Sequence, residues 1–188
     1  MLLRPAARFP LAVSLRSGAG APLGEVFAFA SGLYFRGKLA YARAFGRAGR
    51  GMSAAWVITP GAGLMEPERP VRPQHLRDWS EVDVDLGDER YRGPLERDAR
   101  ALAEQIPGST EVVLLGSIAS DKYVDLLLAV FGARLLFPVD FVGRGDMSRG
   151  GLLLRASRED AELPYRPVLG AIRCGPRPPR LPRLPRSG

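Results

Sequence analysis

The chain has 188 residues, of which 46% are hydrophobic and 25% charged, and its formal net charge is +7. This composition is typical of one globular domain that is long enough to bury a core. The single cysteine, Cys174, excludes an intramolecular disulfide and a CxxC zinc or redox site, and no apolar run approaches the roughly 20 residues of a membrane-spanning helix. We therefore expect a cytoplasmic protein without membrane contact.

The positive charge is concentrated at the C-terminus. Residues 164 to 188 contain six arginines, seven prolines and no acidic residue, which leaves residues 1 to 163 with a net charge of only +1. Proline at that density favours an extended chain over helix or sheet, and such a segment buries too little apolar surface to fold. We predict a single α/β domain over residues 1 to 163 and a Pro/Arg-rich, largely disordered tail over residues 164 to 188, disordered from about Pro176.

Two interpretations of this tail stay open. It can serve as a PxxP-type ligand or as an electrostatic arm for nucleic acid. It can equally reflect an arginine-biased composition without a role of its own, because 25 of the 27 basic residues are arginine and only Lys38 and Lys122 are lysine.

Apolar runs alternate with helix-like stretches along the chain. The predicted elements of the first half are a strand at 11–15, a helix at 34–45, a strand at 55–58 and at most a short helix near 73–79. Those of the second half are a helix from Pro94 to Ile106, a strand at 111–115, a helix at 121–131, a strand at 134–137 and room for a fifth strand at 151–155. Continuous apolar strands that alternate with helices indicate a parallel sheet covered on both faces. The predicted fold is thus a three-layer α/β sandwich with a mostly parallel sheet of four to five strands.

In such a sheet, ligands bind beyond the carboxyl ends of the strands. Four loops follow predicted strands there, and all are rich in glycine or small residues that allow a ligand to approach the backbone: 16–20, 59–66, 116–122 and 140–151. The loop 140–151 is the most informative, because it combines four glycines with Arg144 and Arg149, whose guanidinium groups match phosphate or carboxylate. Asp146 could orient a water or pair an arginine, and a plain structural hairpin explains the same residues.

Two of the other loops offer weaker candidates. Gly116 and Ser117 form a strand-to-helix turn suited to an anion, with Lys122 able to reach back, although Ser117 as a simple helix cap is the alternative. This turn lacks the GxxxxGK[ST] and GxGxxG patterns, which excludes a P-loop and a standard dinucleotide fingerprint. The loop 59–66 could shape a pocket wall and supply Glu66 as a carboxylate, or be purely structural.

The candidate residues can be stated as one set. The catalytic candidates are Asp146 and Glu66, and the ligand-binding candidates are Arg144, Arg149, Ser148, Gly143, Gly145, Gly116, Ser117, Lys122, Gly61 and Gly63. We expect no cofactor and no metal. His75 is the only histidine and Cys174 lies at the edge of the tail, so neither is predicted to be catalytic.

The stretch from Gly32 to about Pro73 resembles a group of small bacterial α/β proteins related to the uracil-DNA-glycosylase-like fold. The resemblance is carried by Leu33-Tyr34 before a basic helix, by the pattern Ile-x-x-x-x-Gly-Leu from Ile58 to Leu64, and by the proline-rich segment after it. It implies an α/β domain that handles nucleobases, nucleotides or nucleic acid. The chain has Leu15-Arg16-Ser17-Gly18 where those proteins carry cysteine and lysine, and it lacks the Gly-Gln-Asp-Pro-Tyr and His-Pro-Ser loops, so glycosylase catalysis is not implied.

From these observations, the sequence predicts a protein that binds an anionic ligand at the loop cluster: a nucleotide, a nucleobase-phosphate or a nucleic-acid end. If it is an enzyme, group transfer or hydrolysis fits best, with Asp146 or Glu66 as acid/base and Arg144 and Arg149 as anion clamps. The alternative is a non-catalytic interaction protein that acts through its basic tail. The sequence leaves the oligomeric state open.

Overall fold

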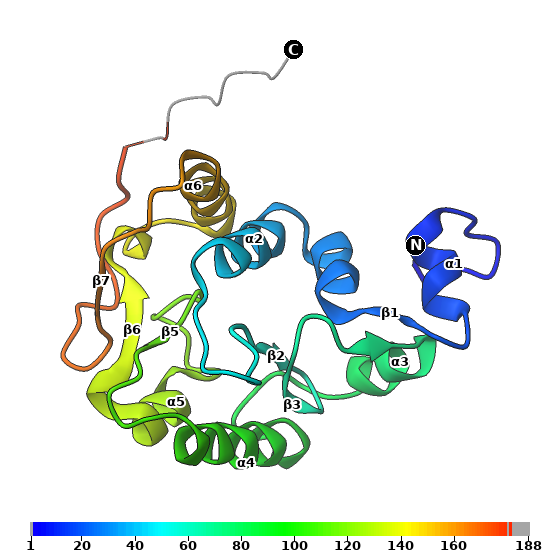
Figure 1. The fold of residues 1–188 in the computed structure, drawn as a ribbon, viewed down its shortest axis with the longest axis horizontal. Helices are drawn as coiled ribbons and strands as arrows, with labels where there is room; N and C mark the ends of the chain where they lie inside the picture. The colour runs from blue at the N-terminus through cyan, green and yellow to red at the C-terminus, as the bar shows by residue number, and fades with distance from the viewer. Residues whose placement is uncertain (1, 180, 182–188) are drawn as a thin grey trace.

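The computed structural model describes residues 2–179 and 181, and helix dominates it, with 46% of these residues in helices and 11% in strands. The helices are α1 (Pro10–Arg16), α2 (Leu23–Phe45), α3 (Pro73–Ser80), α4 (Glu89–Gln105), α5 (Val124–Phe131) and α6 (Asp146–Glu159), with two 3-10 turns, η1 (Gly132–Arg134) and η2 (Val139–Phe141). The strands are β1 (Ala21–Pro22), β2 (Val57–Thr59), β3 (Gly63–Met65), β4 (Pro70–Val71), β5 (Val112–Val113), β6 (Leu135–Pro138) and β7 (Tyr165–Pro167). Figure 1 shows α2 beside α6, the strands β5 to β7 along one side, α4 along the bottom, and α1 and α3 on the opposite side.

The predicted parallel sheet of four to five strands is wrong, and with it the three-layer α/β sandwich. The strands form three small sheets, β1–β4, β2–β3 and β5–β6–β7, and only β5 and β6 run parallel. No described strand exceeds four residues. After β2 the chain does not cross over to a parallel neighbour, because a tight turn ending at Gly63 (φ +66°) brings it straight back, with Thr59 opposite Gly63.

Two predicted strands are helices. The run 11–15 lies within α1, where Pro10 occupies the first turn and Ala12 and Leu15 bury one face. The run 151–155 lies within α6, where Leu152, Leu153 and Ala156 are buried. Both runs are short and apolar, so alternation could not separate strand from helix, and the spacing of the buried positions is helical.

The other predicted elements are confirmed, with shifted ends. The helices at 34–45, 73–79, 94–106 and 121–131 correspond to parts of α2, α3, α4 and α5, and the strands at 55–58, 111–115 and 134–137 to β2, β5 and β6. Helix α2 begins well before Tyr34 and is broken at Gly32, which has φ +64°. Helix α4 begins before Pro94 because the Asp88 side chain accepts a hydrogen bond from the Arg90 N–H and caps it.

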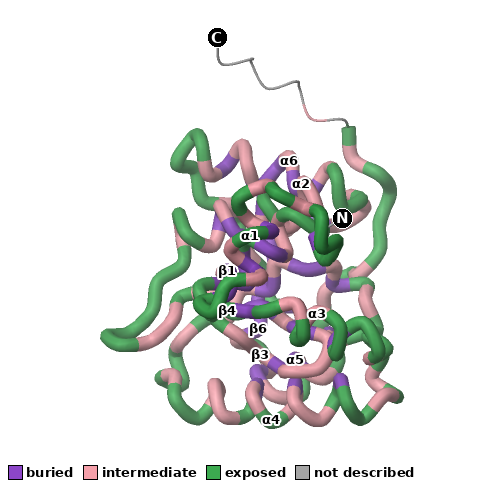
Figure 2. Tube along the Cα trace, turned by 90° about the vertical axis from the view of Figure 1, so that its right-hand side faces the viewer, coloured by how far each residue is buried: buried purple, intermediate pink, exposed green. Residues whose placement is uncertain are grey.

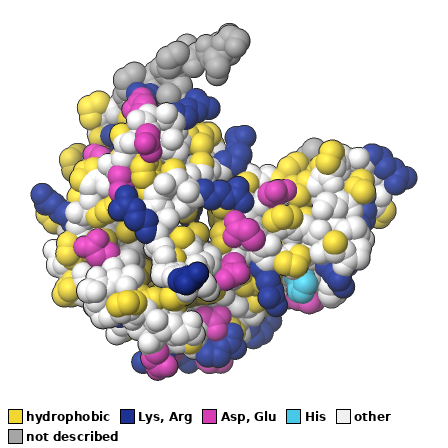
Figure 3. Space-filling model, viewed as in Figure 1, with side chains coloured by type: hydrophobic (Ala, Val, Ile, Leu, Met, Phe, Trp, Pro, Cys, Tyr) yellow, Lys and Arg dark blue, Asp and Glu magenta, His cyan; other side chains and the backbone are white. Residues whose placement is uncertain are grey.

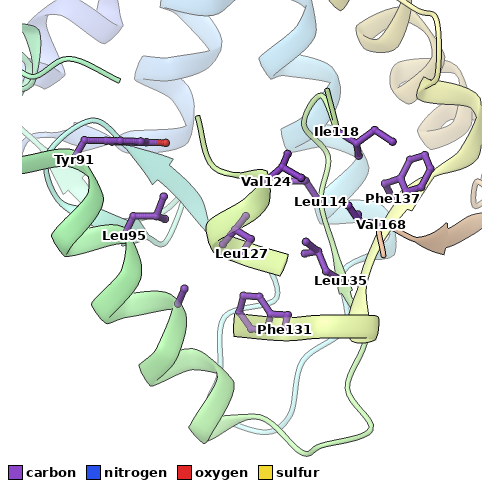
Figure 4. Packing of buried hydrophobic residues seen from close by; sticks show 11 residues of the cluster. Tyr91, Leu95, Leu114, Ile118, Val124, Leu127, Phe131, Leu135, Phe137 and Val168 are labelled. Carbon is purple, nitrogen blue, oxygen red and sulfur yellow. The ribbon is translucent and has the colours of Figure 1, made fainter. Parts of the chain in front are cut away.

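Three apolar clusters hold the molecule together, and Figure 2 shows the buried positions gathered inside it. The largest joins α4, α5 and the β5–β6–β7 sheet, with Leu95, Phe131 and Leu135 among its members (Figure 4). A second joins α1, β1, the start of α2 and Trp79. The third joins the second half of α2 to α6. Helix packing, rather than one central sheet, therefore determines which loops meet.

The C-terminal segment is attached to the domain as far as the structure describes it. Residues 165–167, assigned by sequence to the tail, form β7 beside β6, and Val168 is 1% exposed. Further on, Arg144 donates to the Pro179 carbonyl at 3.4 Å, and Leu181 packs against the third cluster. Most of the segment predicted to be disordered from about Pro176, residues 180 and 182–188, lies outside the described residues.

Across the described part of the chain, no helix is both long enough and apolar enough to cross a membrane.

Candidate functional site

The structure brings the four predicted loops together in two separate pairs instead of one cluster. The loops 116–122 and 140–151 meet at α2 and α6, as shown below. The loops 16–20 and 59–66 meet beside α3, where Ala19 and Ala62 line the same cavity. This split follows from the fold, because no single sheet edge exists to align all four loops. The first pair contains most of the predicted site residues.

Helices α2 and α6 pack very closely because a glycine from each lies at their crossing. A Cβ atom on Gly37 would lie 2.6 Å from the Gly150 carbonyl oxygen, and one on Gly150 would lie 2.7 Å from the Tyr34 Cα. Both distances are shorter than side chains allow, and the atoms met are backbone, so the contact requires glycine. The crossing places Tyr34 and Lys38 of α2 near Asp146 and Arg149 of α6.

Lys38 lies half-buried on the same face of α2 as Tyr34, one helical turn away. Its Nζ is 4.0 Å from the centroid of the Tyr34 ring, and no carboxylate of a described residue lies within ion-pair distance of it. Burial lowers the pKa of Lys38 from 10.5 to about 8; the Asp146 charge opposes this shift and the Arg149 charge adds to it. The amine is therefore about half neutral near pH 8.

Arg149 is almost fully buried, with 11% of its side chain exposed. Its Nε donates to the Phe141 carbonyl at 3.3 Å and its Nη1 to Asp146 Oδ1 at 3.3 Å, while its Cζ lies 5.7 Å from the centre of the Phe141 ring. The Asp146 side chain is 70% exposed, so solvent or a ligand can reach this ion pair from one side. The hydrogen bonds to the Phe141 carbonyl and to Asp146 hold the guanidinium group in place without a ligand.

Two tyrosines fasten the loop after β5 to this position. The Tyr34 hydroxyl donates to the Leu115 carbonyl at 3.1 Å, and the Tyr123 hydroxyl donates to the Ser117 carbonyl at 3.3 Å. Burial raises the pKa of Tyr34 and of Tyr123 above the ordinary value, so both remain protonated donors at neutral pH. A Cβ on Gly116 would lie 2.6 Å from the Tyr123 hydroxyl oxygen, which explains the glycine there.

Together these side chains form the Lys38 site, which we define as Tyr34, Lys38, Tyr123, Asp146 and Arg149. Two cations and one carboxylate give it a net positive charge. Two neutral phenols complete it. Figure 3 shows basic side chains of the described residues scattered among acidic ones on the face that it draws.

Most predicted residues of the 140–151 loop stabilise the loop itself. Arg144 donates to the Asp140 carbonyl at 2.8 Å and to Ser148 Oγ at 3.2 Å, besides its contact with Pro179. Gly143 has φ +72°, and a Cβ there would collide with the Pro176 carbonyl oxygen. Gly145 precedes α6 as its N-cap, and a Cβ there would meet nothing within 4 Å. The alternative interpretation of this segment as a structural hairpin is wrong, because α6 begins at Asp146 and takes up its second half.

The remaining predicted residues lie elsewhere. Lys122 is exposed, and the structure gives its side chain no partner among the described residues. Glu66 is exposed in the second pair of loops, where its carbonyl accepts a hydrogen bond from the Arg69 N–H. Gly61 packs against Trp79, and Gly63 against Asp98, whose carboxylate accepts from the Leu64 N–H at 3.0 Å. The structure gives Glu66 no contact with Asp146, so the two catalytic candidates sit in different loop pairs.

Sequence reasoning did not identify Tyr34, Lys38 and Tyr123 as site residues. A signal for Lys38 was available, because a lysine is conspicuous in a chain with 25 arginines, and Tyr34 lies one helical turn before it. Tyr123 had no such signal, since its role depends on the position of Ser117 in the folded loop.

In the described part of the chain, no group of three or more His, Cys, Asp or Glu side chains is placed to hold a metal ion. Comparison with known protein families, with curated proteins and with solved structures finds no match for this chain. The resemblance of residues 32–73 to uracil-DNA-glycosylase-like proteins therefore stays a prediction.

Proposed function

We propose that this protein binds a small phosphate-bearing ligand, such as a nucleotide, at the Lys38 site. The observation that carries the proposal is the pair of poorly solvated cations, Lys38 and Arg149: among the described residues, Asp146 pairs with Arg149, and no carboxylate lies within ion-pair distance of Lys38. Holding two like charges away from water is costly unless a counter-charge compensates. An anion bound next to Lys38 and Arg149 would supply that counter-charge.

The start of α6 favours phosphate as the anionic group. Gly145 caps this helix without a side-chain hydrogen bond, so no capping side chain occupies the first backbone N–H groups of α6, the helix that carries the Asp146–Arg149 pair. Unpaired N–H groups at a helix N-terminus and the helix dipole both stabilise a phosphate. Among the residues that the structure describes, none lies within 4 Å of a Cβ placed on Gly145. The uracil-DNA-glycosylase-like resemblance supports nucleotides or nucleobase-phosphates within this class.

Isothermal titration with inorganic phosphate, pyrophosphate and adenosine 5′-monophosphate tests the proposal. Lys38→Met keeps the aliphatic stem and removes the charge, and Lys122→Met is the matched control, since Lys122 is the other lysine and lies exposed outside the site. A hydrogen bond to a charged group contributes about 1.5 to 3 kcal/mol, so Lys38→Met should weaken binding by roughly tenfold or more. Lys122→Met should leave it unchanged.

Equal binding by the wild type and Lys38→Met would refute the proposal, and so would an equal loss in Lys122→Met. The absence of saturable binding for all three probes would refute it as well.

A further inference from the structure

The second pair of loops borders a cavity of about 370 Å³ that lies next to α3 and is open to solvent on one side. Ala19 comes from the loop before β1, Ala62 and Met65 from the β2–β3 hairpin, and Pro70 from β4. Figure 1 shows β1 and α3 close together on the side of the molecule away from the β5–β7 sheet. The volume of the cavity falls within the range of small-molecule sites, and its exposed lining surface is largely apolar.

All four polar side chains in the wall of this cavity are hydrogen-bond donors. They are Arg69, Arg72, His75 and Trp79, and no carboxylate from the described part of the chain lines the cavity. His75 Nδ1 accepts the Arg72 N–H at 2.9 Å, so in neutral His75 the proton sits on Nε2, which makes that nitrogen a donor. The structure gives no acceptor, among the described residues, to Trp79 Nε1 or to His75 Nε2. Such a wall matches a ligand that only accepts hydrogen bonds.

Arg72 and Trp79 of the wall are held by contacts with neighbouring parts of the fold. The Arg72 guanidinium donates to the Gly18 carbonyl and ties the loop before β1 to the start of α3. Trp79 is 8% exposed and lies edge-on to the Phe27 ring, with centroids 6.1 Å apart. His75 lies at 30° to Trp79, with centroids 6.0 Å apart. The cavity therefore has a buried aromatic side chain, Trp79, as well as positive charge on its wall.

We propose that this cavity is a second binding site, distinct from the Lys38 site, for a small aromatic compound that carries a carboxylate or phosphate group. The ring would pack against Trp79 and the apolar residues around it. The anionic group would accept hydrogen bonds from Arg69 and from His75 Nε2, which supply the charge and the donor geometry it needs.

The test follows the Trp79 indole N–H signal by NMR in the full chain. The chain has two tryptophans, and Trp56→Phe identifies which signal belongs to Trp79. Phenyl phosphate and benzoate carry both a ring and an anion, benzyl alcohol only the ring, and inorganic phosphate only the anion. We expect a saturable shift of the Trp79 signal with phenyl phosphate, benzoate or both, and at least tenfold weaker effects with the other two probes.

Variants assign the effect to the cavity. Arg69→Met should weaken binding at least tenfold, and His75→Asn, which keeps an acceptor for the Arg72 N–H, should also weaken it. Arg77→Met is the matched control, because Arg77 is exposed on α3, the helix that carries His75, and does not line the cavity. Lys38→Met should keep the Trp79 shift, which separates this site from the proposed function.

Four results would overturn the proposal: no saturable shift with either ring-bearing anion, equal binding of benzyl alcohol, unchanged binding in both Arg69→Met and His75→Asn, or loss of the shift in Lys38→Met. A difference between phenyl phosphate and benzoate shows only which anion the site prefers. Tighter binding of either one supports the proposal.

Discussion

Replacing Lys38 by methionine should make the protein more stable. The pKa of Lys38 falls from 10.5 to about 8 in the folded protein, mainly because the amine is buried. Since a tenfold change in an acid dissociation constant corresponds to about 1.4 kcal/mol, the folded state is penalised by up to about 3.5 kcal/mol when the amine is charged. Water that reaches the partly exposed amine reduces this value, and we expect Lys38→Met to gain about 1 to 3 kcal/mol at pH 7.

The sign and the pH window follow from the same two pKa values. Between pH 8 and 10.5 the unfolded chain keeps a proton on Lys38 that the folded chain has lost, so the stability of the wild type rises with pH across that window. Below pH 8 both states are protonated, and the penalty is present in full. The stability gap between Lys38→Met and the wild type should therefore be largest at pH 7 and fall to roughly half by pH 9.5.

Urea unfolding of both proteins at pH 7 and pH 9.5, followed by tryptophan fluorescence, measures the gap. Tyrosines titrate in both proteins and cancel in the difference. Lys122→Met, at an exposed position, should stay within about 0.5 kcal/mol of the wild type at both pH values. A gap that does not change with pH, or a Lys38→Met protein that is less stable than the wild type at pH 7, would show that Lys38 is not desolvated.

The remaining predictions concern the same region and the core. Gly150→Ala should cost about 1 to 3 kcal/mol in urea unfolding because its Cβ meets α2 backbone, whereas at Gly151→Ala the nearest atom is 3.8 Å away and the change should be neutral or stabilising. An acetylating reagent should modify Lys38 readily near pH 8, as measured by mass spectrometry. Asp146→Asn should shift that reactivity to lower pH, because it removes the charge that raises the pKa of Lys38. An unchanged pH profile of acetylation in Asp146→Asn would contradict this. Tyr91→Phe should be neutral or stabilise by about 1 kcal/mol, since the Tyr91 hydroxyl, seen in Figure 4, is fully buried and no described residue bonds to it; a clear loss of stability would indicate a partner for it.

Helices were predicted better than the sheet. The segments that became α3, α4 and α5 carry local signals, such as a proline in the first turn or apolar residues on one face, that do not depend on the rest of the fold. Strand pairing depends on partners far apart in sequence, so an apolar run such as 11–15 could be read equally as strand or helix. Among the candidate site residues, Asp146 and Arg149 lie three residues apart and form an ion pair, a proximity that short-range spacing can predict. Lys38 comes from another helix, so spacing along the chain does not place it near them.

By itself, the sequence determined the charge balance, the rarity of lysine, the positions of the glycine loops and most of the helices, because composition and short-range spacing fix these properties. Only the tertiary structure decided which loops meet. The close approach of Gly37 and Gly150 lets α2 and α6 touch, and that contact places Lys38 beside Arg149. A contact between residues more than a hundred positions apart leaves no periodic trace in either segment, and its energetic consequence, an amine deprived of water, exists only once the two helices are packed.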